Sequence, residues 1–131
     1  MIRPLLPALI LFIQIFHPMG FQGDIVDTLS AFFKAANSKE ISKNFAPSVE
    51  LNINNTEDEY SKAQAEQILR EFFTKNPPIS SAVVHLINTN PNYRFGVVAL
   101  GTKNGKFRVA ITLKKTANTF FITELRIEPD K

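Results

Sequence analysis

Apolar residues recur at helical spacing in three stretches that follow residue 23. In the first, which runs to Ala36, they mark one face of a helix whose N-terminus Asp24 can cap. In the second, Asn37 with Glu40 three residues later predicts a short helix that Pro47 closes. These two helices open the folded part of the chain.

The third stretch predicts the longest helix. Ser61 and Gln64 form a capping box at its start. The segment 76–78, Asn-Pro-Pro, ends it because the residue before a proline disfavours helical backbone. Ahead of this helix, residues 49–53 alternate between apolar and polar and predict a half-buried strand. Residues 54–59 are polar and acidic and predict a connection between that strand and the helix.

From residue 79 the pattern changes to strands, predicted at 79–89, 93–102, 106–115 and 119–128. The dipeptide Asn104-Gly105 predicts a two-residue type I′ turn, which places Leu100 opposite Val109. This register is self-consistent because the apolar residues of both strands then share one face.

Two loops are compatible with the last turn. A two-residue loop would place Ile111 opposite Glu124. A three-residue loop at 116–118, with Asn118 in the left-handed region, places Leu113 opposite Phe121 instead. The second pairs apolar with apolar residues, and we therefore predict it.

Helices first and a strand meander last predict an α+β fold, in which N-terminal helices pack on a curved antiparallel sheet. The 131 residues suffice for one domain, expected at 24–131. Two helical stripes and one sheet face should form its core. The expected core residues are Phe32, Phe33, Leu69, Phe72, Phe73, Val98, Leu100, Val109, Ile111, Leu113 and Leu125.

The first 23 residues have the pattern of a secretory signal peptide. Arg3 supplies a positive start, residues 5–16 form an apolar run, and His17-Pro18-Met19-Gly20 ends it. The run is too short for a comfortable membrane anchor. We therefore expect a periplasmic or secreted protein, cleaved near residues 20–23, with no integral membrane segment afterwards.

The amino-acid composition excludes several kinds of site and partner. Twelve Phe and no Trp predict a dry aromatic core. The absence of Cys excludes disulfides, thiolate catalysis and zinc–thiolate sites. A net charge of +3 with basic and acidic residues interleaved gives no stripe for nucleic acid, so no nucleic-acid partner is expected.

The order of helices and strands is similar to the cone-shaped fold of nuclear transport factor 2 and ketosteroid isomerase, a cystatin-like superfold. A closer likeness rests on the segments 60–69, 72–73, 76–78, 104–109 and 125–128. These resemble an exported bacterial family named domain of unknown function 4783, over nearly all of residues 24–131. That family has no assigned activity, so the resemblance implies a fold and a periplasmic setting but no catalysis.

Acid–base chemistry in such a cone would need a carboxylate and a proton donor that converge. The available residues are His85, Tyr93, Glu50 and Glu124. Glu124 is expected on the outer face beside Arg126, as a surface ion pair. His85 lies in a segment that is apolar on both sides, so its facing stays open and no catalytic residue is assigned.

An oxygen-rich stretch at 52–59 could hold Ca²⁺, but it lacks the spaced Asp and Gly pattern of a dedicated loop. Acidic residues just before a helix are explained more simply by the helix dipole. We therefore expect no metal and no cofactor. Candidate ligand-binding residues in the cone are His85, Phe33 and Phe73.

The face of the sheet opposite the core is expected to be small and apolar at its centre. Its predicted residues are Phe95, Val97, Ala99, Ala110, Thr112 and Ile122. An apolar patch with a charged rim is typical of an interaction surface, so a homodimer through this face is a hypothesis.

These patterns favour a non-enzymatic binding or interaction module that holds a small apolar ligand in the cone. The alternative is an enzyme with acid–base chemistry in the same cavity, of an isomerase or dehydratase type. Titratable side chains that converge in a pocket would favour the enzyme, and a cone filled by Phe would count against it.

Overall fold

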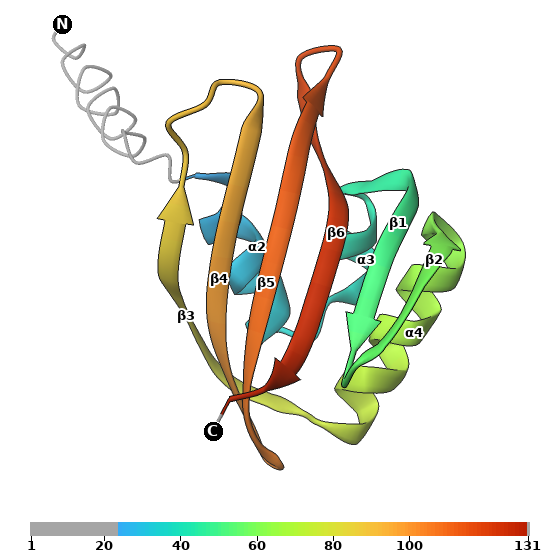
Figure 1. Ribbon diagram of the computed structural model, residues 1–131. Coiled ribbons are helices and arrows are strands. Elements are labelled where there is room, and N and C mark those ends of the chain that lie inside the picture. Colours follow the sequence, from blue (N-terminus) through green and yellow to red (C-terminus); the bar gives the residue numbers. More distant parts are fainter. Residues whose placement is uncertain (1–23, 131) are drawn as a thin grey trace, which may run out of the picture.

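A computed structural model describes residues 24–130 of the chain (Figure 1). The signal peptide predicted for residues 1–23 lies outside these described residues. The elements are α2 (Ile25–Lys34), α3 (Ser38–Ser42), β1 (Phe45–Ile53), β2 (Thr56–Ser61), α4 (Lys62–Lys75), β3 (Pro78–Ile87), β4 (Tyr93–Thr102), β5 (Gly105–Thr116) and β6 (Thr119–Pro129). The α+β fold predicted from the sequence is confirmed.

All three predicted helix caps are present. The Asp24 side chain accepts a hydrogen bond from the Val26 backbone N–H at 3.1 Å. Asn37 caps α3 through the Glu40 N–H, also at 3.1 Å. Ser61 and Gln64 form the predicted capping box of α4. Each cap satisfies backbone donors that the first turn of a helix leaves free.

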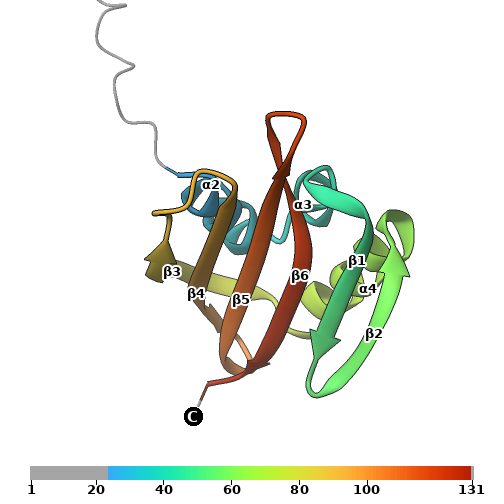
Figure 2. The same ribbon diagram turned by 45° about the horizontal axis from the view of Figure 1, so that its top comes forward.

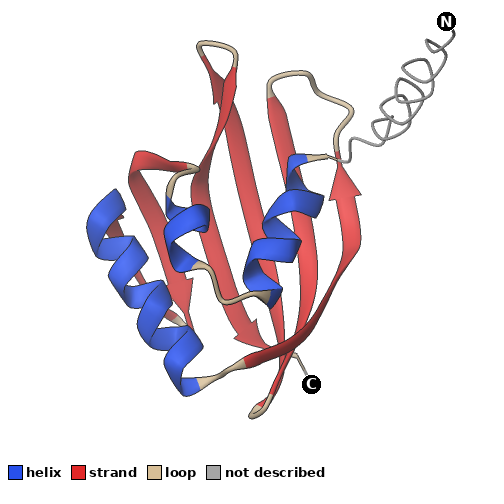
Figure 3. Cartoon of the chain, turned by 180° about the vertical axis from the view of Figure 1, so that it is seen from behind, coloured by secondary structure: helices blue, strands red, loops and turns tan. Residues whose placement is uncertain are grey.

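The six strands form one sheet in the order β2-β1-β6-β5-β4-β3. Neighbouring strands are antiparallel, except that β1 runs parallel to β6. The sheet curves, and helices α2, α3 and α4 lie on its concave face (Figure 3). We call the opposite side the outer face.

The start of the sheet differs from the prediction. The short helix ends at Ser42, and Pro47 lies within β1 instead of closing that helix. Pro47 is exposed in a stretch of β1 where the pairing with β6 shifts, a position that tolerates a missing N–H. The acidic segment predicted as a connection forms β2. Asn54 and Asn55, with φ of 53° and 67°, make the turn between β1 and β2.

The β4–β5 turn lies one residue earlier than predicted. Thr102 pairs with Gly105, and Leu100 pairs with Phe107 instead of Val109. Gly105 takes the positive φ of 115°, while the Thr102 hydroxyl donates to its carbonyl at 2.7 Å. The register is displaced by two residues, so every side chain keeps the face that was predicted for it.

The β5–β6 turn also corrects the sequence prediction. The loop has two residues, Ala117 and Asn118, both left-handed at φ 52° and 67°. A bulge in β6, between the partners of Leu113 and Thr112, then shifts the pairing and places Ile111 opposite Leu125. The two-residue loop was rejected because it would place Ile111 opposite Glu124, and the bulge removes that conflict.

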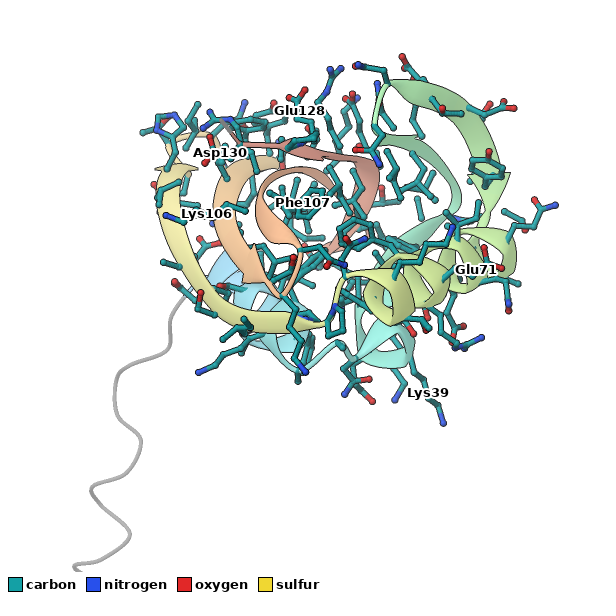
Figure 4. All side chains as sticks on the ribbon, turned by 90° about the horizontal axis from the view of Figure 1, so that it is seen from below. Lys39, Glu71, Lys106, Phe107, Glu128 and Asp130 are labelled. Carbon is teal, nitrogen blue, oxygen red and sulfur yellow. The ribbon has the colours of Figure 1, made fainter. Side chains whose placement is uncertain are left out.

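Phenylalanine rings connect the helices to the sheet. Phe33 of α2 packs against Phe73 of α4 with ring centroids 5.7 Å apart, edge to face. Phe72 packs against Phe73 at 5.9 Å and against Phe107 of β5 at 5.0 Å. Figure 4 shows Phe107 directed into the curl of the sheet. Every predicted core residue is buried except Phe32, which is half-buried beside the cluster.

Helix α2 crosses β4 at very close range. A Cβ at Gly96 would lie 2.5 Å and 2.8 Å from the two methyl carbons of Val26, which is fully buried. At the start of the same helix, Arg94 Nε donates to Asp24 Oδ2 at 2.9 Å. The missing side chain at Gly96 is therefore what lets α2 lie flat on the sheet.

We predict that Gly96→Ala lowers the free energy of unfolding by about 1–3 kcal/mol, because the new methyl group overpacks against Val26. In the double variant with Val26→Ala the space is returned, so the two losses should not add. Urea denaturation of the four proteins in this cycle measures the coupling. Strictly additive losses would show that Val26 is not the obstacle.

Candidate functional site

The structure separates the three residues predicted to bind a ligand in the cone. Phe33 is fully buried and Phe73 is 5% exposed, and both belong to the core. His85 lies on β3 at the edge of the sheet, exposed, with its ring 6.3 Å from that of Phe95. These residues do not form one pocket, because the phenylalanines fill the interior and His85 faces away from it.

The residues considered for acid–base chemistry do not converge either. Glu50 and Glu124 pair across β1 and β6 on the outer face. Glu124 lies 4.0 Å from Arg126, as the predicted surface ion pair. Tyr93 is half-buried at the far end of β4. Among residues 24–130 there is no group of three or more His, Asp or Glu side chains arranged to hold a metal ion.

Figure 2 shows α4 beside the β1–β2 hairpin. A groove of about 220 Å³ lies between this helix and the hairpin. Its floor is apolar: Leu51 and Phe72 are almost completely buried, and Ile53 and Ile68 are half-buried. Tyr60 of β2 forms part of its wall. Sequence reasoning missed this groove because it did not predict β2, which supplies that wall.

Polar groups line the mouth of the groove. Glu71 and Lys75 come from the last turns of α4, and Figure 4 labels Glu71 on that helix. Asn54 comes from the hairpin turn, and Asn76 caps the helix end. The Asn104 side chain donates to the Lys75 carbonyl at 2.5 Å, which ties this end of α4 to the β4–β5 turn. The groove is therefore apolar at its floor and charged at its entrance.

The outer face of the sheet has an apolar half and an acidic half. Five of the six predicted face residues lie on the apolar half: Phe95, Val97, Ala99, Ala110 and Thr112. Val97 is only 1% exposed, and the other four are half-buried. Ile122 was predicted here and lies in the core instead, because the two-residue β5–β6 loop pairs it with the buried Leu113.

The acidic half of the outer face crowds like charges. Glu50 pairs directly with Glu59 of β2 and Glu124 of β6. A hydrogen bond to Glu57 and the negative charges of Glu57 and Glu124 raise the pKa of Glu50 above its ordinary value of 4.5. Protonation of Glu50 thus relieves a repulsion that exists only in the folded protein.

The fold and the family of the protein follow from comparison with known proteins. Solved structures of proteins like nuclear transport factor 2 and of a cystatin-like domain share its architecture, which places it in that class. The family described as Domain of unknown function (DUF4783) matches residues 26–128. The chain belongs to this family.

Solved members of the family come from Bacteroides. The DUF4783 protein of Bacteroides ovatus is 32% identical over 79% of this chain and 93% of its own, with a TM-score of 0.75. That of Bacteroides uniformis is 29% identical over 82% and 99%, with a TM-score of 0.78. A cystatin-like domain from Nostoc punctiforme is 9% identical over 78% and 70%, with a TM-score of 0.63. No curated protein matches the chain.

We predict that Glu50→Gln raises the free energy of unfolding at neutral pH. The folded state holds the Glu50 proton more tightly than the unfolded state. Ionised Glu50 therefore lowers the free energy of unfolding; this loss is absent below pH 4.5 and grows as the pH rises through the raised pKa. Urea denaturation across pH measures the gain, which should vanish in acid and shrink in high salt. Glu66→Gln, which removes a partner of Arg70, should show no such gain. A gain that is equal at every pH would contradict the repulsion.

Proposed function

We propose that this protein is a non-enzymatic binding module that holds a small apolar group in the groove between α4 and the β1–β2 hairpin. The observation that carries the proposal is the groove's apolar floor, formed by Leu51, Ile53, Ile68 and Phe72. Apolar surface left open beside a few polar groups is the usual character of a small-molecule site. Pocket walls from both a helix and a hairpin favour a preformed site.

The filled cone supports a site at this groove over one in the interior. The rings of Phe33, Phe72, Phe73 and Phe107 pack against one another between the helices and the sheet, where a ligand in the interior would have to lie. The acid–base enzyme considered from the sequence needs two titratable groups directed at one reacting atom. The groove offers Glu71 and Lys75 at its exposed mouth, a position suited to recognition, while Glu50 and Glu124 lie on the outer face.

The proposal includes export to the periplasm. It rests on Arg3, the apolar run at 5–16 and the break at His17-Pro18-Met19-Gly20. Within residues 24–130, no helix is long and apolar enough to cross a membrane.

A second part of the proposal is a homodimer through the apolar half of the outer face. Phe95, Val97, Ala99, Ala110 and Thr112 form a continuous small apolar surface, bordered by Arg108 and Arg126 on the neighbouring positions. Exposed strand faces normally carry long polar side chains at such positions. Val84 and Ile87, exposed at 56% and 41%, extend this surface to the edge strand β3.

The groove is tested with indole, a neutral apolar probe. We expect indole to shift the amide resonances of α4 and the β1–β2 hairpin in two-dimensional NMR spectra. Ile68→Lys should weaken this binding by about tenfold or more, because a charge then enters the apolar floor. Ile79→Lys, at a site that is 57% exposed and outside the groove lining, is the matched control. Shifts confined to β3 and β4 would mean that the outer face, and not the groove, binds the probe.

The dimer is tested by light scattering of the domain that starts at Asp24, at micromolar concentration. We expect twice the monomer mass, and Ala110→Arg should restore the monomer because it places a charge in the apolar surface. Thr74→Arg, on the exposed side of α4, is a control of equal charge. A monomeric mass that Ala110→Arg leaves unchanged would end this part of the proposal.

A further inference from the structure

Two opposite charges at the mouth of the groove are not paired with each other. Glu71 and Lys75 are four residues apart on α4, in the order that favours an ion pair. One turn earlier, Glu66 and Arg70 have the same spacing and pair at 2.7 Å. Within the described part of the chain, the Glu71 and Lys75 side chains form no salt bridge. Helix α4 thus pairs Glu66 with Arg70, while Glu71 and Lys75 lie at the groove without pairing with each other.

The part of the groove below these charges is small and apolar. The volume of about 220 Å³ is below the roughly 300–1,000 Å³ of typical drug-sized sites. It accommodates a single branched or aromatic side chain over Leu51, Ile68 and Phe72. A cation and an anion side by side at the entrance complement a head group that carries both charges.

We propose that the groove binds a free apolar α-amino acid. Its side chain lies on the floor, its ammonium group faces Glu71, and its carboxylate faces Lys75. The amides of Asn54 and Asn76 add hydrogen-bonding capacity at the same entrance. This inference rests on the proposed binding function of the groove and names the class of its ligand.

Charge complementarity selects this ligand over simpler ones. A carboxylic acid of the same shape would satisfy Lys75 but bring like charge to Glu71. An amine would satisfy Glu71 and bring like charge to Lys75. An amino acid carries both groups on one carbon, so it alone among the three satisfies both side chains at once.

The test compares L-leucine with two analogues that each lack one charge, 4-methylpentanoate and 3-methylbutylamine. Isothermal titration calorimetry should show each analogue binding about fivefold more weakly than leucine, since each loses one partly exposed ion pair. Glu71→Gln should reduce leucine affinity to that of 4-methylpentanoate, and Lys75→Met should reduce it to that of the amine. Glu66→Gln, on the same helix outside the groove, should leave all three unchanged.

The outcomes separate this inference from the function on which it rests. If indole binds the groove but leucine binds no better than its analogues, the amino-acid inference is wrong and the binding function stands. If neither indole nor leucine binds the folded protein, the proposed function fails as well. Leucine binding that Glu71→Gln and Lys75→Met leave intact would place the head group elsewhere and overturn the inference.

Discussion

Edge-to-face contact among four phenylalanine rings holds the helices on the sheet. Phe33 comes from α2, Phe72 and Phe73 from α4, and Phe107 from β5, so the cluster joins three elements that are far apart in sequence. Phenylalanine has no polar atom to satisfy, and the cluster can therefore be completely dry. The rings fill the interior, and the groove proposed as a binding site lies outside it, between α4 and the β1–β2 hairpin.

The architecture was largely predictable from the sequence, because helix caps and apolar periodicity are local signals. Asp24, Asn37 and Ser61 all cap as expected. The registers of the β4–β5 and β5–β6 pairs were not predictable in this way, because each depends on the detailed geometry of a turn or bulge. The β4–β5 turn uses Gly105 as its left-handed residue, and the β6 bulge absorbs a residue that alternation alone cannot reveal. The two-residue β5–β6 loop, one residue shorter than predicted, turns Ile122 from the outer face into the core.

The candidate site was less predictable than the fold. Its floor residues Leu51 and Phe72 were recognised as apolar, but their open side becomes a groove only when β2 folds back beside α4. The segment that forms β2 is acidic and carries Asn54-Asn55, whose left-handed turn was the available signal. The acidic residues of this segment led us to predict a connection and not a strand. An exposed edge strand, however, commonly carries charged side chains that protect it from pairing with another chain.

The parallel pairing of β1 with β6 has a consequence for when the site can exist. The hairpin that walls the groove joins the rest of the sheet only through the final strand, with Leu51 beside Leu125 and Ile53 beside Ile127. Pairs so distant in sequence form late, because a long loop must close first. The chain therefore completes the wall of its groove only after its C-terminal residues are available, so a chain that lacks β6 would leave the β1–β2 hairpin without its neighbour in the sheet.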